Sequence, residues 1–165
     1  MRRLIVVGLF CFLLAGESLA QLATPLYEGS PSPHPGVTAF YTYMGLLGRH
    51  RFEEAFRYRV GVAREEFLQR VQDEWQDYED LFARAGFTFL GWDVRAVDYW
   101  EDVGGNTYIR MIQTFRLRKG ENLLLRHAGF LFRVTFRGNS IYTIDPIRGQ
   151  ILREEERPFP AGEGR

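Results

Sequence analysis

Cysteine is almost absent from this sequence of 165 residues, and its single occurrence, Cys11, lies inside an apolar run near the start. The run follows a basic beginning and precedes small residues at Ser18 and Ala20. This pattern predicts a secretory signal peptide over residues 1–20, cleaved after Ala20. The exported chain then contains no cysteine, which excludes a disulfide, a thiolate metal site and a cysteine nucleophile. Such a chain must be stabilised by its hydrophobic core.

Net charge is absent as well, because 21 lysine and arginine residues balance 21 aspartate and glutamate residues. A protein that binds nucleic acid typically carries a basic stripe, so we predict no nucleic-acid partner. The signal peptide predicts a secreted or periplasmic protein. An uncleaved membrane anchor is the alternative, but the apolar run is too short to span a bilayer comfortably. After cleavage we expect no stable membrane insertion.

Motifs for catalysis and cofactor binding are also missing. The sequence contains no Gly-x-Ser-x-Gly nucleophile elbow, no His-Glu-x-x-His metal motif, no phosphate-binding loop and no dinucleotide fingerprint. Acidic residues do cluster within residues 63–85, but acidic clusters on helices are usually solvated surfaces. A metal site there needs ligands that converge from other elements. We therefore predict neither a cofactor nor a bound metal.

Composition divides the rest of the chain into three parts. Residues 21–36 are rich in proline, glycine and serine and predict an extended linker. Residues 37–147 carry regular apolar periodicity and many aromatic residues, which predict one α+β domain with a large core. Residues 148–165 contain a run of three glutamates and two prolines, which predict a flexible charged tail.

Three helices are predicted at the start of the domain. Residues 37–47, 51–60 and 63–85 place apolar side chains three and four positions apart, which is the spacing of one buried helix face. A glycine follows each of these segments, and glycine commonly ends a helix. We therefore expect the domain to begin with three amphipathic helices, each of which buries one apolar face.

Four strands are predicted in succession, over residues 87–101, 107–118, 123–137 and 140–145. The segments between them are rich in glycine and asparagine, which accept the positive φ of hairpin turns. Alternation along the strands places apolar side chains on one face and mixed side chains on the other. This is typical of an antiparallel sheet that is covered on one side.

Three polar residues interrupt the inward, apolar phase of the strands: Asp98, Gln113 and Arg126. Burying an unpaired polar group costs roughly 1–3 kcal/mol. These residues therefore pair with each other, line a wet cavity, or follow a bulge that reverses the phase. Gly91 and Gly129 are the candidate bulge positions.

The order of three helices and an antiparallel meander resembles the NTF2-like superfamily, the α+β cone fold. The local cues are the helix, small-residue break and short helix over residues 37–56, and the closing hairpin over residues 130–146. The resemblance covers about residues 37–147. It implies a cone in which three helices pack on a curved antiparallel sheet of about four strands, with a cavity between them.

Members of this superfamily include isomerases, dehydratases, cyclases and binding modules, and the catalytic ones often use an aspartate that points into the cone. Asp98 is the only acid on the inward phase of the strands here, so the resemblance makes it the candidate catalytic residue. Side chains that reach the same space are the predicted ligand-binding residues: Tyr43, Tyr78, Trp92, Asp98, Gln113 and Arg126.

Two classes of function follow. The first, which we favour, is a non-catalytic extracytoplasmic module that binds an apolar small molecule in the cone or forms a homodimer through the outer sheet face. An apolar patch of Leu123, Leu125 and Leu131 is expected on that face. The alternative is a small isomerase-, dehydratase- or cyclase-like enzyme with Asp98 as general acid or base. That enzyme requires Asp98 to face an open cavity, whereas an ion pair with Arg126 makes Asp98 structural.

Overall fold

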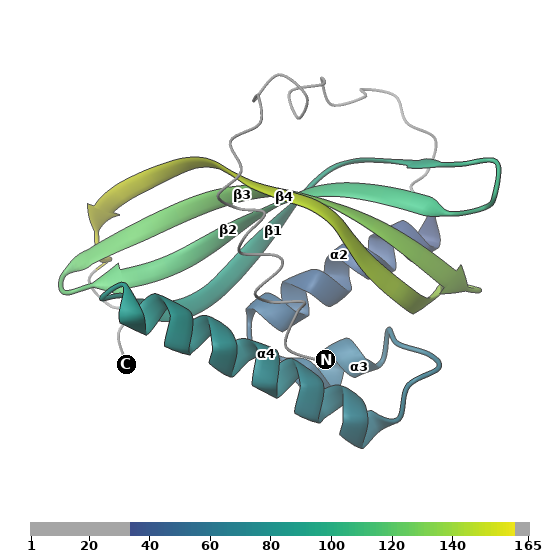
Figure 1. The fold of residues 1–165 in the computed structure, drawn as a ribbon, viewed down its shortest axis with the longest axis horizontal. Helices are drawn as coiled ribbons and strands as arrows, with labels where there is room; N and C mark the ends of the chain where they lie inside the picture. The colour runs from purple at the N-terminus through teal and green to yellow at the C-terminus, as the bar shows by residue number, and fades with distance from the viewer. Residues whose placement is uncertain (1–33, 161–165) are drawn as a thin grey trace.

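The computed structural model describes residues 34–160, which form three helices followed by a four-stranded antiparallel sheet (Figure 1). The helices are α2 (Pro35–Gly48), α3 (Phe52–Phe56) and α4 (Arg64–Arg84). The strands are β1 (Thr88–Glu101), β2 (Thr107–Lys119), β3 (Asn122–Arg137) and β4 (Ser140–Pro158). The predicted α+β class and the predicted order of elements are confirmed. The predicted signal peptide and most of the predicted linker lie outside the described residues.

Local chemistry explains where the first and last helices begin and end. Pro35 starts α2 because its fixed φ suits a first helical turn, and the ring Nδ1 of His34 accepts a hydrogen bond from the backbone N–H of Gly36 at 3.1 Å. Gly86, with φ of +82°, follows α4 and turns the chain into the sheet. None of the helices within residues 34–160 is long and apolar enough to cross a membrane.

The second helix is shorter than predicted, because it ends at Phe56 and not at residue 60. The residues that follow leave the helix to pair with the start of β4. Val60 donates a backbone hydrogen bond to Ile141 at 3.0 Å, and Ile141 donates one to Tyr58 at 2.8 Å. A single parallel bridge therefore joins Arg59 to Ile141 and holds Arg59 beside the sheet. These hydrogen bonds to β4 pair the backbone N–H of Val60 and the backbone carbonyl of Tyr58, which would otherwise pair within a longer helix.

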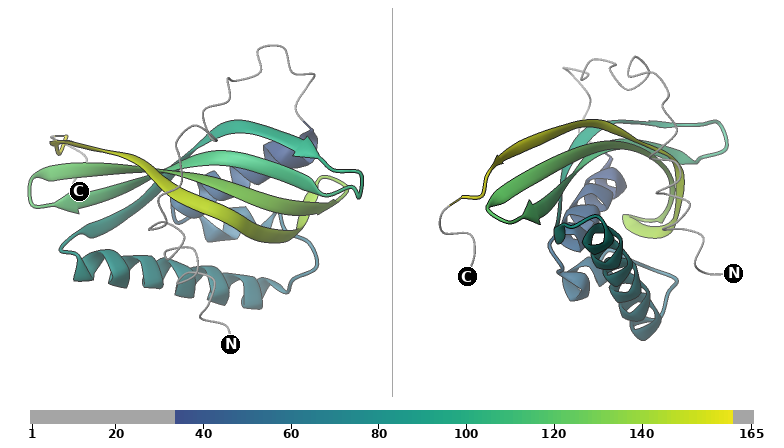
Figure 2. Two further views of the ribbon diagram at one scale, coloured as in Figure 1. Left: turned by 45° about the horizontal axis from the view of Figure 1, so that its top comes forward. Right: turned by 60° about the vertical axis from the view of Figure 1, so that its left-hand side comes forward.

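The sheet has the order β1-β2-β3-β4 and curves around α2 and α4, which lie on its concave side (Figure 2). The β1–β2 register shifts twice, between Phe89 and Trp92 and again between Ala96 and Asp98. The first shift includes Gly91, whose φ is +98°, so the predicted bulge at this glycine is confirmed. The second shift has no glycine in it.

The predicted bulge at Gly129 is wrong for the β2–β3 ladder. Gly129 pairs regularly with Ile112 on β2, and the nearest irregularity is in the β3–β4 ladder, between His127 and Ala128. A glycine within a strand marks a position that tolerates a bulge, but pairing on both sides decides whether a bulge forms.

The prediction that residues 148–165 form a flexible tail is wrong up to Pro158, because β4 continues through this segment beside the whole of β3. The charged residues of the segment have partners across the ladder. Arg126 donates to Glu154 at 2.5 Å, and Asn122 donates to Glu156 at 2.6 Å. Cross-strand pairing of this kind stabilises a strand whose composition is otherwise typical of disorder.

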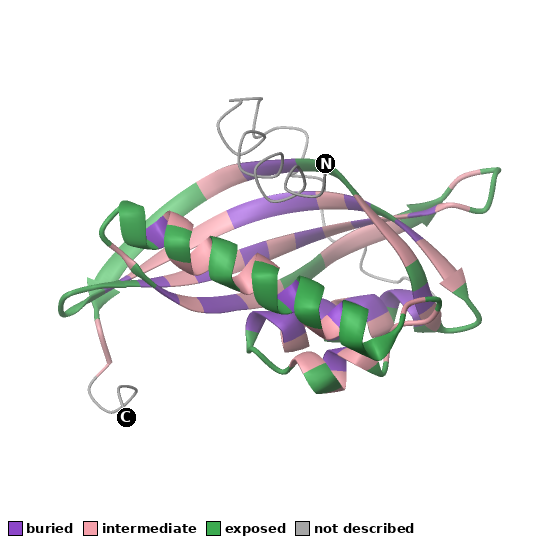
Figure 3. Ribbon diagram, turned by 60° about the horizontal axis from the view of Figure 1, so that its bottom comes forward, coloured by how far each residue is buried: buried purple, intermediate pink, exposed green. Residues whose placement is uncertain are grey.

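One core lies between the helices and the concave sheet face, and buried positions occur on both the helices and the strands (Figure 3). Phe40 of α2 contacts Phe132 of β3 edge to face at 5.5 Å between ring centroids. The largest side chains that are fully buried come from both layers and include Phe40, Phe67, Phe115, Phe130 and Ile109. Aromatic side chains thus fill much of the space between the layers.

The outer face of the sheet does not expose the predicted apolar patch. Leu123 is only 3% exposed, and Leu125 and Leu131 are half-buried. Arg133 instead forms an ion pair with Asp145 on this face at 2.9 Å. The apolar patch on this face is therefore smaller than predicted, and the homodimer through it stays a prediction.

Candidate functional site

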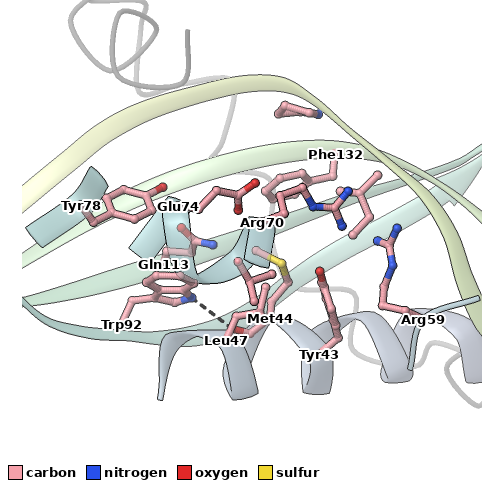
Figure 4. A pocket seen from close by; sticks show the side chains of 13 residues that line it. Tyr43, Met44, Leu47, Arg59, Arg70, Glu74, Tyr78, Trp92, Gln113 and Phe132 are labelled. Atoms are coloured by element: carbon pink, nitrogen blue, oxygen red, sulfur yellow. Dashed lines mark hydrogen bonds between the residues drawn. The ribbon is translucent and has the colours of Figure 1, made fainter. Parts of the chain in front are cut away.

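A cavity of about 180 Å³ lies between α2, α4 and the concave face of the sheet (Figure 4). Every one of these layers contributes to its wall, and so does the segment after α3. Its apolar lining includes Met44, Leu47, Trp92 and Phe132. Its polar lining consists of Tyr43, Arg59, Arg70, Glu74, Tyr78 and Gln113.

The indole of Trp92 forms one wall of the cavity in a fixed orientation. Its Nε1–H donates a buried hydrogen bond to the carbonyl of Met44 at 3.1 Å, which joins β1 to α2. Tyr78 of α4 packs against it at a tilt, with 5.6 Å between ring centroids. An aromatic wall held from two sides in this way keeps its shape when the cavity fills.

One end of the cavity is cationic. The guanidinium groups of Arg59 and Arg70 and the hydroxyl of Tyr43 point toward the same region (Figure 4). Arg59 donates through Nη2 to the carbonyl of Tyr142 at 3.2 Å, and its guanidinium carbon lies 5.7 Å from the ring centroid of Tyr43. Burial lowers the pKa of Arg59 and raises the pKa of Tyr43 to about 12. Tyr43 therefore keeps its proton and remains a hydrogen-bond donor at neutral pH.

The other end of the cavity brings together Glu74, Tyr78 and Gln113 (Figure 4). Burial raises the pKa of the Glu74 carboxyl, and the nearby Arg70 partly opposes that shift. Burial also raises the pKa of the Tyr78 hydroxyl, which stays protonated. Gln113 is 3% exposed, and its amide nitrogen lies 4.0 Å from the sulfur of Met111, which is a weak contact.

The structure brings four of the six predicted ligand-binding residues to this cavity: Tyr43, Tyr78, Trp92 and Gln113. Arg126 is not among them, because it pairs with Glu154 and lies 5.7 Å from the ring centroid of Phe82. The ion pair expected between Asp98 and Arg126 does not form.

Asp98 also lies away from the cavity, on the outer face of the sheet. Ala96 pairs with Met111, which is fully buried, so the normal alternation would direct Asp98 inward. After the register shift, however, Asp98 pairs with Arg110, which is preceded by the fully buried Ile109 and therefore faces outward. Two charge-assisted hydrogen bonds join the carboxylate of Asp98 to the guanidinium of Arg110.

The second bulge is supported by a tertiary contact. Tyr41 of α2 donates to the backbone carbonyl of Arg110 at 2.9 Å and also lies 3.3 Å from the carbonyl of Asp98. The helix thus supplies a hydrogen bond at the point where the ladder is irregular. Nothing in the local sequence of β1 predicts this contact.

Three charged residues of the cavity were missed by the sequence analysis: Arg59, Arg70 and Glu74. Glu74 had a signal, because it lies three residues after Val71 and four before Tyr78, on the phase of the buried stripe of α4. Its place in the acidic cluster of residues 63–85, which is typical of a solvated surface, hides this signal. Arg59 had no local signal, because only its pairing with Ile141 turns it toward the cavity.

Comparison with family models, curated proteins and solved structures finds no match to this chain. Within residues 34–160, no three histidine, aspartate or glutamate side chains come together to hold a metal ion. What the geometry offers is an apolar cavity with polar groups at its two ends, an arrangement typical of small-molecule sites.

Proposed function

We propose that this chain is a non-catalytic, extracytoplasmic binding module of the NTF2-like type, which holds a largely apolar small molecule between its helices and its sheet. The observation that carries this proposal is the cavity of about 180 Å³ bounded by Trp92, Met44 and Phe132. The core around this cavity is packed with aromatic and aliphatic side chains, and polar groups lie at both ends of the cavity.

The position of the cavity supports the proposal. Small-molecule sites are concave and mostly apolar, with a few polar groups that orient the ligand. Here the walls come from α2, α4 and all four strands, so the site exists only in the folded chain. The resemblance to the cone fold expects a cavity in the same place, between the helices and the sheet.

The enzyme alternative that uses Asp98 is not retained. It required the carboxylate to face the cavity with a second polar group within reach. Asp98 lies on the opposite face of the sheet and is neutralised by Arg110. Asp98 therefore has a structural role, in which its carboxylate pairs with the guanidinium of Arg110.

A cavity-filling substitution tests the proposed function. Ile144 lines the cavity from β4, so Ile144→Phe places a larger side chain in it. Ile147 on the same strand is exposed and does not line the cavity, so Ile147→Phe is the matched control. Native mass spectrometry of the protein purified from its own host measures any small molecule that is retained.

We expect the unmodified chain and Ile147→Phe to retain the same small molecule and Ile144→Phe to lose it. Thermal unfolding of both variants checks that each remains folded. Equal retention by a folded Ile144→Phe would place the ligand elsewhere and would overturn the proposal.

A further inference from the structure

Arg59 is a half-buried cation that has no ion-pair partner among the residues that the structure describes. Its Nη2 donates to the carbonyl of Tyr142, its guanidinium also interacts with the neutral hydroxyl of Tyr43, and its Nε–H is buried with no partner. Among residues 34–160, no carboxylate forms an ion pair with Arg59 within 4.0 Å. Burying a charge without a counter-ion is costly, so an anion in the cavity would stabilise this arrangement.

The charges that line the cavity do not cancel. Arg59 and Arg70 carry two positive charges, and Glu74, when ionised, carries one negative charge. Arg70 lies four residues before Glu74 on α4, the spacing at which opposite charges attract across one helical turn. When the positive charge of Arg70 balances the negative charge of Glu74, the cavity has a net charge of about +1, which belongs to Arg59. The cavity therefore matches an anion with one negative charge.

The donors at this end also match a planar anion. A guanidinium presents its N–H groups as a rigid fork that fits the two oxygens of a carboxylate. The hydroxyl of Tyr43 keeps its proton at neutral pH and lies beside the same guanidinium, so it adds a donor but no charge. Away from this end the wall is apolar, with Met44 and Trp92.

We infer that the ligand of this cavity is a small monocarboxylic acid with an apolar body, whose carboxylate is bound by Arg59 and whose body lies against Trp92. This inference rests on the proposed function, because it names the ligand class of the same cavity. It gives the charge of Arg59 a partner that residues 34–160 do not supply.

The test compares an acid with its neutral isostere. The probes are 3-phenylpropionate and 3-phenylpropionamide, which differ in charge but hardly in shape, and calorimetric titration into the full chain measures the affinity of each. Arg59→Gln removes the charge, and Arg59→Lys keeps the charge but not the fork. Arg57→Gln is the matched control, because Arg57 is exposed two residues away and does not line the cavity.

We expect the unmodified chain and Arg57→Gln to bind the acid at least about tenfold more tightly than the amide. In Arg59→Gln the two affinities should differ by less than about twofold, and Arg59→Lys should keep only part of the preference. If Arg59→Gln does not fold, the same comparison in Arg59→Lys still decides between the outcomes.

Two results separate this inference from the proposed function. If the amide binds the unmodified chain as tightly as the acid, or if a folded Arg59→Gln keeps the full preference, the carboxylate assignment is overturned while the cavity remains a binding site. If neither probe binds, and native mass spectrometry finds no retained molecule, the proposed function fails and the inference fails with it.

Discussion

Gly48 and Gly91 lie in direct contact, with the end of α2 against the first bulge of β1. A Cβ atom at Gly91 would lie 2.1 Å from the carbonyl oxygen of Gly48, and a Cβ atom at Gly48 would lie 2.1 Å from the carbonyl oxygen of Trp92. Real Cβ atoms do not approach backbone atoms so closely. Two glycines at these positions therefore let α2 pack onto the sheet at the wall of the cavity.

Gly91→Ala should destabilise the fold by about 3 kcal/mol or more, because it adds a clash with backbone to an unfavourable φ of +98°. Gly86→Ala is the matched control, since Gly86 has φ of +82° but no atom within 4 Å of the added Cβ. That control should cost only the strain, about 1 kcal/mol. Urea unfolding measures both values, and equal losses would contradict the role assigned to the close contact.

Trp92→Phe should lower the free energy of unfolding by about 1–2 kcal/mol. The substitution removes the buried hydrogen bond from Nε1 to the carbonyl of Met44 and shortens the side chain that forms the cavity wall. Trp100 is 42% exposed and stacks on Tyr108, so Trp100→Phe should cost less. Guanidinium unfolding of both variants compares them, and the opposite ranking would show that the buried hydrogen bond contributes little.

Glu74→Gln should change stability in a pH-dependent way. Because burial raises the pKa of Glu74 above its ordinary value of 4.5, the folded state holds the proton more tightly than the unfolded state does. The resulting stabilisation is complete below that ordinary value and is lost as the pH rises through the raised value. Glu74→Gln should therefore stabilise the fold near pH 7 and leave its stability almost unchanged near pH 4.

Thermal unfolding as a function of pH measures this difference. The exposed Asp80 on the same helix provides the control Asp80→Asn. A constant gain from Glu74→Gln at every pH would show that ionisation of the carboxyl is not its cause.

Asp98→Asn should lower stability by about 1–2 kcal/mol without changing ligand binding. The substitution removes the carboxylate that pairs with the partly buried guanidinium of Arg110, on the side of the sheet away from the cavity. Chemical unfolding measures the first effect, and ligand retention in native mass spectrometry measures the second. Loss of the ligand from a folded Asp98→Asn variant would restore Asp98 as a residue of the site.

The elements of the fold were predictable because their signals are local. The spacing of apolar residues along each segment predicted three helices and four strands. The glycine and asparagine residues between the strands predicted the hairpin turns. The same logic found Tyr43, Tyr78, Trp92 and Gln113, since each points inward by the simple period of its own element. It also found the bulge at Gly91, where glycine marks the positive φ.

Asp98 was misplaced because the second bulge of β1 contains no glycine. One irregular pairing reverses every side chain beyond it, and the hydrogen bond from Tyr41 that accompanies this pairing comes from a distant helix. The end of β4 was missed for a similar reason. Its glutamates predict a flexible tail from sequence, but in the sheet Glu154 lies opposite Arg126 and Glu156 accepts a hydrogen bond from Asn122 of β3.

The sequence by itself determined the number and order of the helices and strands and the apolar side of most of them, because these depend on spacing along a few residues. Only the tertiary structure decided which charges face the cavity. Arg59 points there through its bridge to Ile141, and Asp98 points away through a shift of register. Both positions depend on pairing between residues that are far apart in the chain, and periodicity within one segment carries no information about such pairing.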